Sequence, residues 1–334
     1  MNNVIEPFDV INKRYKILKE IGSGVYGKIF TLKDEDEDNF TIKALKVHNN
    51  ESKYNFSIKR EKQILEELTL LQLDEKEFVP ILYKTIKFKN HICFIMKLYD
   101  INLYEFQKNT FNNKNYNINL LLSIIKQLFQ AIEFIHKNKI IHCDIKPENI
   151  LFKKNTQNII ICDFGLSQKI ESTFVEYIYP IQSTYYRAPE VSIKTQYNTK
   201  IDIWSIGTII YELLSNNVLI NGKDNYNIIG KIVTVIGNPS NELINSDNNW
   251  KKFFNILPYD SSYSFLNNEE KKYTPFSKII NKKAINNKFV IYDDDKSFDK
   301  LKFIWLLLKK TIKWDMNKRL SATQILDIFN ENNY

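Results

Sequence analysis

Residues 142–149 read His-Cys-Asp-Ile-Lys-Pro-Glu-Asn, and the apolar run Ile150-Leu151-Phe152 follows. This spacing places Asp144, Lys146 and Asn149 on one short loop. On such a loop an aspartate can accept a hydroxyl proton, a lysine can hold a phosphate, and an asparagine can ligate a magnesium ion. A charged loop between a helix and a strand is the alternative, but the presence of all three groups favours the chemical interpretation.

A second metal-ligand motif follows closely. Asp163-Phe164-Gly165 begins fourteen residues after Asn149. Two magnesium-ligand motifs in this order rarely occur by chance. We therefore expect Asn149 and Asp163 to bind magnesium.

A glycine-rich segment lies near the start of the chain. Residues 15–21 are typical of a strand, and Gly22-Ser23-Gly24-Val25-Tyr26-Gly27 follows. Glycines at this spacing let backbone N–H groups approach nucleotide phosphates. A dinucleotide-binding fold would need a helix next, whereas residues 28–32 are typical of a second strand. A strand–turn–strand nucleotide loop is therefore favoured, with Ile21 and Ser23 beside its three glycines.

Residues 40–47, Phe-Thr-Ile-Lys-Ala-Leu-Lys-Val, predict a third strand. Lys46 would contact the α- and β-phosphates of a nucleotide, while Ala44 and Ile29 would cover the adenine. The alternative for Lys46 is a solvated strand lysine, which is what we expect of Lys43. The position of Lys46 after the glycine-rich segment favours the phosphate-binding role.

Apolar residues recur at helical spacing over residues 57–73 and predict a helix. Glu61 on this helix could pair with Lys46 and fix its ammonium group. Glu66 and Glu67 are competing candidates. The local pattern around Glu61 favours that residue.

The connector at residues 97–100 would hydrogen-bond an adenine through its backbone, with Leu98 beside the base. Met96 would lie behind the adenine and Leu151 beneath it. Met96 can equally be a core residue, because methionine fills gaps, and both interpretations can hold together.

The remaining elements are expected in chain order. They are a polar hairpin tip at 34–38, a buried strand at 91–96, helices from 102, at 119–137, 200–214 and 303–312, a hairpin of 150–152 with 158–162, and loops with short helices over 238–300. Asp202 is expected to cap the backbone of the 142–149 loop, the alternative being an ordinary acid at a helix N-terminus. Arg319 is expected to form a buried ion pair with Glu190.

The composition is that of an ordinary globular protein, with 334 residues, 43% of them apolar and 26% charged. No apolar run approaches the roughly 18 residues of a membrane span, and residues 1–10 lack the features of a signal peptide. We therefore expect a soluble intracellular protein, cytoplasmic or nuclear, with no membrane partner. Cys93, Cys143 and Cys162 form no C-x-x-C pair, so we expect reduced, buried thiols.

The net charge is +8, with lysines spread along the whole chain among acidic residues. The sequence lacks the clustered basic and aromatic residues typical of a nucleic-acid-binding surface, so no nucleic acid is expected. A basic surface that favours acidic or phosphorylated partners is expected instead.

Together these residues resemble the eukaryotic protein kinase family, from Tyr15 to about Phe329. The matching positions, in order, are Gly22, Gly24, Gly27, Lys46, Glu61, Asp144, Lys146, Asn149, Asp163, Ala188-Pro189-Glu190, Asp202 and Arg319. The resemblance implies an α+β fold in two lobes within one kinase domain, residues 1–334. Residues 15–96 would form a small antiparallel β-sheet with one main helix, and residues 101–330 a mainly α-helical lobe.

The resemblance also implies ATP and Mg²⁺ as cofactors, protein substrates and a monomer. Asp144 would be the catalytic base for transfer of the γ-phosphate to serine and threonine hydroxyls, and Lys146 would steady that phosphate. Lys46, fixed by Glu61, would position the α- and β-phosphates. The segment between Asp163 and residue 188 would be an activation and substrate-docking loop.

Within the family, residues 186–190, Tyr-Arg-Ala-Pro-Glu, resemble the CMGC group. Residues 142–144, 102–105 and 181–183 are similar to those of the dual-specificity tyrosine-regulated and homeodomain-interacting kinases. Residues 197–199, Tyr-Asn-Thr, are also similar to the SR-protein kinases.

Departures from the family pattern concern regulation. Cys143 stands where many kinases carry a phosphate-binding arginine, Gln168 offers no cation, and Arg60 alone remains of a three-arginine pocket. We therefore predict activity without a phosphothreonine switch.

The regulatory tyrosine of the dual-specificity kinases is replaced by Pro180, with Tyr179 and Tyr177 just before it. Tyrosine autophosphorylation therefore stays open. Thr184 replaces a basic residue common in this group, which weakens any substrate preference inferred from it.

Two other classes of function remain as alternatives. A catalytically inactive scaffold would bind nucleotide without turnover, although every catalytic position is filled. A nucleic-acid-binding protein is suggested only by the basic charge.

Overall fold

The computed structural model describes residues 4–24, 27–36, 41–72, 76–112, 117–256, 263–265 and 295–334. The chain divides into two compact units. The first unit comprises Met1–Ile101 with Leu151–Ser167, and the second comprises Asn102–Ile150 with Gln168–Tyr334.

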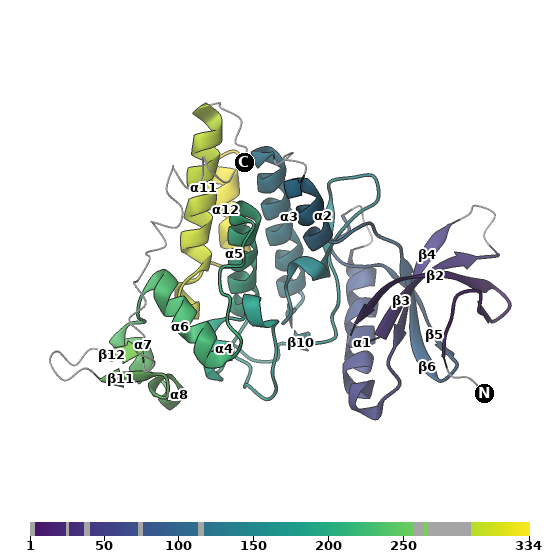
Figure 1. Ribbon diagram of the computed structural model, residues 1–334, viewed down its shortest axis with the longest axis horizontal. Helices are drawn as coiled ribbons and strands as arrows, with labels where there is room; N and C mark the ends of the chain where they lie inside the picture. The colour runs from purple at the N-terminus through teal and green to yellow at the C-terminus, as the bar shows by residue number, and fades with distance from the viewer. Residues whose placement is uncertain are drawn as a thin grey trace. The chain divides into compact units, whose positions relative to one another are not determined.

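The first unit is built on a six-stranded antiparallel sheet of order β1-β2-β3-β4-β6-β5, with helix α1 beside it (Figure 1). The bounds are β1 Val10–Ile11, β2 Tyr15–Gly24, β3 Gly27–Asp34, β4 Ile42–His48, α1 Asn55–Leu71, β5 Leu82–Phe88 and β6 His91–Lys97. A short hairpin, β8 (Ile150–Phe152) with β9 (Ile159–Ile161), follows later in the chain.

Side chains along β4 alternate between the two faces of this sheet. Leu45 and Val47 are buried in a core that also contains Phe30 and Leu32 of β3. Because successive side chains of a strand point to opposite faces, Lys46 lies on the other face. Sequence periodicity therefore decides which lysine of β4 faces away from this core.

Asp34 is fully buried at the end of β3, contrary to the predicted polar hairpin tip. Arg14 donates to both of its carboxylate oxygens, at 2.7 and 2.8 Å, and Lys43 donates at 2.8 Å. The prediction of a solvated Lys43 is wrong for the same reason, because its side chain is only 9% exposed beside Asp34. Residues 37 and 38 of the predicted tip and Phe40 of the predicted third strand lie outside the described residues.

The second unit is mainly helical, and α3, α5, α11 and α12 pack together within it (Figure 1). Its helices are α2 Leu103–Asn112, α3 Ile118–Lys137, α4 Pro189–Ile193, α5 Lys200–Ser215, α6 Asn225–Ile236, α7 Asn241–Asn245, α8 Asn248–Lys251, α11 Asp295–Thr311 and α12 Ala322–Glu331. Its short strands are β7 Ile140–Ile141, β10 Gln168–Lys169, β11 Phe254–Ile256 and β12 Tyr263–Phe265.

Helix α5 is buried on all sides, as expected of a helix at the centre of a core. Its contact with α11 is close at Gly207, where an added Cβ would lie 2.5 Å from Thr311 Oγ1. Helix α3 is long and apolar enough to cross a membrane, contrary to the expectation that no segment would be. Most of its apolar residues are buried within the second unit, as in the core helix of a globular protein.

The predicted α+β class is confirmed, and the predicted elements occur with boundaries shifted by one to three residues, except that α11 begins earlier than expected. Leu73, the predicted end of the first helix, lies outside the described residues. Strands β1, β5, β7 and β10 and helices α4, α6 and α12 were not predicted, and strands β11 and β12 lie where loops and short helices were expected. Of the predicted loop region 238–300, residues 257–262 and 266–294 lie outside the described residues.

Candidate active site

The first unit brings Lys46, Glu61 and Asp163 together. Lys46 Nζ donates to Glu61 Oε1 at 2.5 Å and to Asp163 Oδ1 at 3.0 Å. The predicted Lys46–Glu61 ion pair is thus present. The competing candidate Glu66 is half exposed and pairs with Lys62 on the surface of α1.

Charge and burial act against each other in this cluster. Burial disfavours the charged form of Lys46, but the carboxylates of Asp163 and Glu61 raise its pKa above the ordinary value. Burial raises the pKa of Glu61, and the nearby Lys46 ammonium opposes that rise. Lys46 therefore stays charged and can neutralise phosphate oxygens.

Asp163 reaches the cluster through an unusual backbone conformation. It lies two residues after the end of β9 and has φ 68°, in the left-handed region that is costly for a residue with a Cβ. Strand β9 is tied to the unit by the Ile161 N–H, which donates to the Phe78 carbonyl at 2.9 Å. The chain just before Asp163 is therefore fixed within the first unit.

The three glycines at the end of β2 and the start of β3 have different structural constraints. Gly27 has φ +146°, and a Cβ there would lie 1.9 Å from the Val47 carbonyl oxygen. A Cβ on Gly22 would come no closer than 3.9 Å to a described atom, and one on Gly24 would meet none within 4 Å. Among these three positions, contacts with described atoms therefore require glycine only at position 27. Val25 and Tyr26 lie outside the described residues.

The candidate adenine-binding residues also lie in the first unit. Ala44 pairs in register with Met96, and Ile29 with Lys46, across neighbouring strands. Ala44 is buried, whereas Ile29, Met96, Leu98 and Leu151 are half-buried and Ile21 is exposed.

Hydrogen bonds join the connector to strand β8. The Asp100 N–H donates to the Phe152 carbonyl at 2.8 Å, and the Phe152 N–H donates to the Ile101 carbonyl at 3.0 Å. These bonds bring Leu151, the residue before Phe152, next to the connector.

In the second unit, Asp144 is the centre of a hydrogen-bonded cluster. The Lys146 ammonium lies 2.9 Å from Asp144 Oδ2. Asn149 Nδ2 donates to the Asp144 carbonyl at 2.9 Å. This bond orients the amide so that its oxygen, a hard ligand suited to magnesium, is the atom that a cation could bind.

Ser183 completes this cluster. Its backbone N–H and its hydroxyl donate to Asp144 Oδ1, at 2.9 and 2.8 Å. Lys146 Nζ donates to the Ser183 hydroxyl at 3.2 Å. Ser183 was noted in the sequence only as part of a family-like stretch, because nothing local reveals a partner 39 residues away.

Asp202 holds the loop from within α5, as predicted. Its carboxylate accepts the backbone N–H groups of His142 and Cys143 at 2.9 and 3.0 Å. Cys143 has φ 66°, so this anchoring supports another strained position. His136 Nε2, which the sequence did not single out, lies 2.9 Å from Asp202 Oδ2.

Gln182 joins the candidate activation loop to this framework. It is buried, has φ 59°, and its N–H donates to the Cys143 carbonyl at 2.9 Å. Its side chain donates to Ser205 Oγ at 2.8 Å and accepts the Ala188 N–H at 3.0 Å. Arg187 Nη2 donates to the Gln182 carbonyl at 2.9 Å.

The residues that bear on regulation have several protein contacts. Arg60 Nη2 donates to the Gly165 carbonyl at 3.4 Å, and the guanidinium lies 5.2 Å from the centre of the Phe56 ring. Gln168 Nε2 donates to the Tyr179 hydroxyl at 3.1 Å. Cys93 and Cys143 are buried thiols, as expected, but Cys162 is only half-buried.

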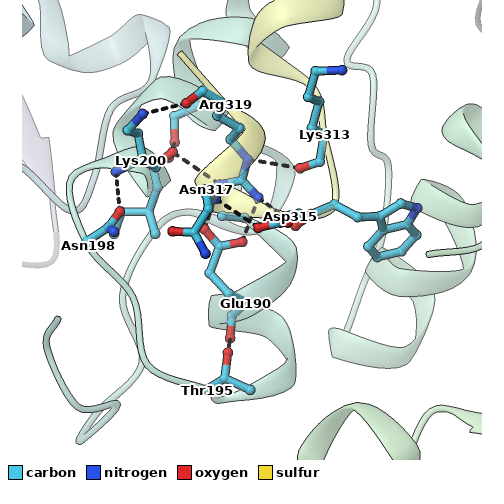
Figure 2. Close-up of polar contacts among 12 residues, drawn as sticks. Glu190, Thr195, Asn198, Lys200, Lys313, Asp315, Asn317 and Arg319 are labelled. Atoms are coloured by element: carbon cyan, nitrogen blue, oxygen red, sulfur yellow. Dashed lines mark hydrogen bonds and ion pairs between the residues drawn. The ribbon is translucent and has the colours of Figure 1, made fainter. Parts of the chain in front are cut away.

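The predicted ion pair between Glu190 and Arg319 is also present. Arg319 Nη1 and Nη2 donate to the two Glu190 oxygens at 2.6 and 2.7 Å, and both side chains are buried (Figure 2).

The two predicted magnesium ligands belong to different units, Asp163 to the first and Asn149 to the second.

Comparison with known proteins adds an independent finding. A family model described as "Protein kinase domain" matches residues 15–328. The dual specificity tyrosine-phosphorylation-regulated kinase 3 of Mus musculus is 35% identical over 255 residues, covering 75% of this chain and 42% of that protein. The dual specificity tyrosine-phosphorylation-regulated kinase 4 of Homo sapiens is 31% identical over 319 residues, covering 95% of this chain and 57% of that protein. The serine/threonine-protein kinase ppk15 of Schizosaccharomyces pombe is 35% identical over 246 residues, covering 73% of this chain and 45% of that protein. The chain thus spans about half the length of these relatives.

Proposed function

The chain belongs to the protein kinase family, whose members use ATP and a divalent metal ion, and from this premise we propose that it phosphorylates serine and threonine hydroxyls of proteins. Its relatives place it with the dual-specificity tyrosine-regulated kinases of the CMGC group. The observation that carries the proposal is the Asp144 cluster, in which Ser183 and Lys146 hold the carboxylate at 2.8 and 2.9 Å.

Asp144 orients the substrate hydroxyl and accepts its proton. Ser183 donates twice to Asp144 Oδ1, which leaves Oδ2, beside Lys146, as the second oxygen of the carboxylate. The Lys146 ammonium neutralises charge on the phosphoryl group in transfer. Phosphoryl transfer depends mainly on positioning and charge neutralisation, so a carboxylate fixed on both sides suits this role.

Nucleotide binding is assigned to the first unit. The backbone of residues 22–27 and the Lys46 ammonium bind the phosphates. Glu61 fixes Lys46. Ile21, Ile29, Ala44, Met96, Leu98 and Leu151 line the adenine.

Asn149 and Asp163 are proposed as magnesium ligands, each contributing one side-chain oxygen. Their amide and carboxylate oxygens are the ligands that magnesium prefers. Magnesium would supply charge neutralisation of the ATP phosphates.

Activity without a phosphothreonine switch is part of the proposal. Gln182 and Ser183 bind the candidate activation loop to Cys143 and Asp144 through hydrogen bonds that need no phosphate. Arg60 already contacts the Gly165 carbonyl. Recombinant protein that is inert until an upstream kinase phosphorylates it would contradict this proposal.

Autophosphorylation on Tyr177 or Tyr179 is kept as an open extension of the same activity. Measuring the intact mass of the purified protein and mapping its peptides would show whether either tyrosine is phosphorylated.

The net charge of +8 favours acidic or phosphorylated protein substrates. We further propose a monomer that works inside the cell, in cytoplasm or nucleus, without a membrane or nucleic-acid partner.

The decisive experiment compares wild-type protein with Asp144→Asn. Both are assayed for ATP consumption with a basic protein and with a Ser/Thr/Tyr peptide array. Turnover by wild type that falls by orders of magnitude in the variant, at unchanged melting temperature, is the expected result. Nucleotide binding without turnover in wild type would instead favour the scaffold function.

A further inference from the structure

His48 is a polar side chain buried on the nucleotide-binding face of the first unit. It ends β4, two residues after Lys46, so both side chains point to the same face of the sheet. The residue is 1% exposed, and its ring packs edge-on against Phe94 with ring centres 4.3 Å apart. Buried strand positions of this kind usually carry apolar residues, so the histidine needs an explanation.

The ring nitrogen Nε2 of His48 is buried and makes no hydrogen bond with the described residues. The nearest carboxylate oxygen is Glu61 Oε2, at 4.0 Å. Burial, followed by the positive charge of Lys46, lowers the pKa of His48 to about 3. The ring is therefore neutral at physiological pH, and a neutral imidazole can carry its single proton on Nε2 and donate it.

Glu61 has an oxygen that such a donor could reach. Its Oε1 accepts from Lys46 at 2.5 Å, whereas Oε2 lies on the side of His48. The Lys46 ammonium is shared with Asp163 at 3.0 Å. If Lys46 turns toward bound phosphates, Glu61 loses part of this interaction while remaining buried.

We propose that His48 is a positioning residue for Glu61, with its Nε2–H donating to Oε2 when nucleotide is bound. Closing the gap from 4.0 Å to a hydrogen bond needs a shift of only about 1 Å between α1 and β4. The bond keeps the carboxylate aligned with Lys46 while the ammonium contacts phosphates. The inference rests on the proposed nucleotide-binding function of Lys46 and deepens it.

The His48 main chain is well placed to support this role. The His48 carbonyl oxygen lies 2.7 Å from His91 Nδ1, which ties the end of β4 to β6. The Phe94 ring restrains the imidazole from one side. The backbone and ring are thus held while α1 supplies the movement.

Three substitutions separate this role from simple packing. His48→Val removes the donor and suits a buried strand. His48→Gln places an amide nitrogen near the position of Nε2, whereas the shorter His48→Asn places one near Nδ1. Each variant is measured for melting temperature without nucleotide, Kd for Mg-ADP, and KM and kcat for ATP.

We expect the melting temperature of His48→Val to equal or exceed that of wild type, because a buried unpaired donor is removed. Its Kd for Mg-ADP and KM for ATP rise about tenfold, as expected for loss of a hydrogen bond to a charged group. His48→Gln recovers most of this loss and His48→Asn does not. In a Glu61→Gln background, His48→Val changes nucleotide affinity much less, since the two residues act together.

Unchanged Kd and KM in His48→Val would overturn the proposal. So would equal losses of affinity and melting temperature in all three variants, which indicate a purely structural role. Mg-ADP affinity tests the inference even if wild type transfers no phosphate, so failure of the kinase function is recognised separately. Wild-type protein that binds no nucleotide would overturn both.

Discussion

Asp144 accepts two hydrogen bonds from one residue, Ser183, whose backbone N–H and hydroxyl both donate to Oδ1 at 2.9 and 2.8 Å. The same hydroxyl accepts from Lys146 at 3.2 Å. Ser183 therefore links the proposed base to the proposed phosphate-binding lysine. Its position depends on the buried Gln182 beside it, whose N–H is bound to Cys143.

Replacing Ser183 should lower turnover without unfolding the protein. Ser183→Ala keeps the backbone donor but frees Asp144 and Lys146 to move, and small losses of positioning are costly in rate. We expect kcat to fall about tenfold with a melting temperature close to that of wild type. Ser183→Thr keeps the hydroxyl and should retain most of the rate. Equal kcat in the alanine variant would show that the Ser183 hydroxyl does not position Asp144.

The glycines at the end of β2 and the start of β3 should separate stability from nucleotide binding. Gly27→Ala introduces a Cβ 1.9 Å from the Val47 carbonyl oxygen at φ +146°, so we expect destabilisation of at least about 2 kcal/mol. Gly24→Ala meets no described atom within 4 Å and should leave stability unchanged while weakening Mg-ATP binding. Thermal unfolding and nucleotide titration of both variants check this. Unchanged affinity in Gly24→Ala would argue against phosphate contact there.

The sequence predicted those parts of the site whose chemistry lies in short motifs. Asp144, Lys146 and Asn149 are close in the chain, so their spacing alone indicated a shared loop. The Lys46–Glu61 pair was also predicted, because the residues around Glu61 match the usual kinase pattern better than those around Glu66 and Glu67. The proposed roles of these residues stay predictions.

The parts that were missed depend on contacts between distant segments. Lys43 and Asp34 resembled surface charges, but Arg14 completes a buried ion cluster with them. Gln182 gives no local signal of its buried contacts either. A polar residue at a strand position otherwise suited to apolar side chains is the one sign that could have drawn attention to His48.

Glu212 should make stability depend on pH between about 4 and 6. Burial raises its pKa to about 6, although Tyr186 donates to it at 2.8 Å and opposes the rise. A raised carboxyl pKa means that the unfolded chain, with a glutamate pKa of about 4.3, releases its proton first. Its contribution is therefore fully present below about pH 4 and lost as pH rises through 6, by about 2 kcal/mol.

Glu212→Gln keeps an acceptor for Tyr186 but cannot ionise. We expect its melting temperature to match wild type near pH 4 and to exceed it at pH 7. A difference in melting temperature that stays constant from pH 4 to pH 7 would contradict this prediction, because it would show that Glu212 has the same pKa in the folded and unfolded chains.

Breaking the buried Glu190–Arg319 pair should cost the second unit roughly 3 kcal/mol of stability, because the remaining partner is left buried and unpaired. Arg319 also donates to the carbonyls of Lys313 and Lys200 at 2.9 and 3.1 Å (Figure 2). A lysine ammonium cannot reproduce this planar set of donors, so Arg319→Lys should lose roughly 3 kcal/mol in urea unfolding. Glu190→Gln keeps one acceptor and should cost less. The double variant should lose less than the sum of the two, because each single change leaves a buried partner unpaired. Additive losses of unfolding free energy, or an Arg319→Lys protein as stable as wild type, would show that packing around these side chains, and not the ion pair, stabilises this part of the second unit.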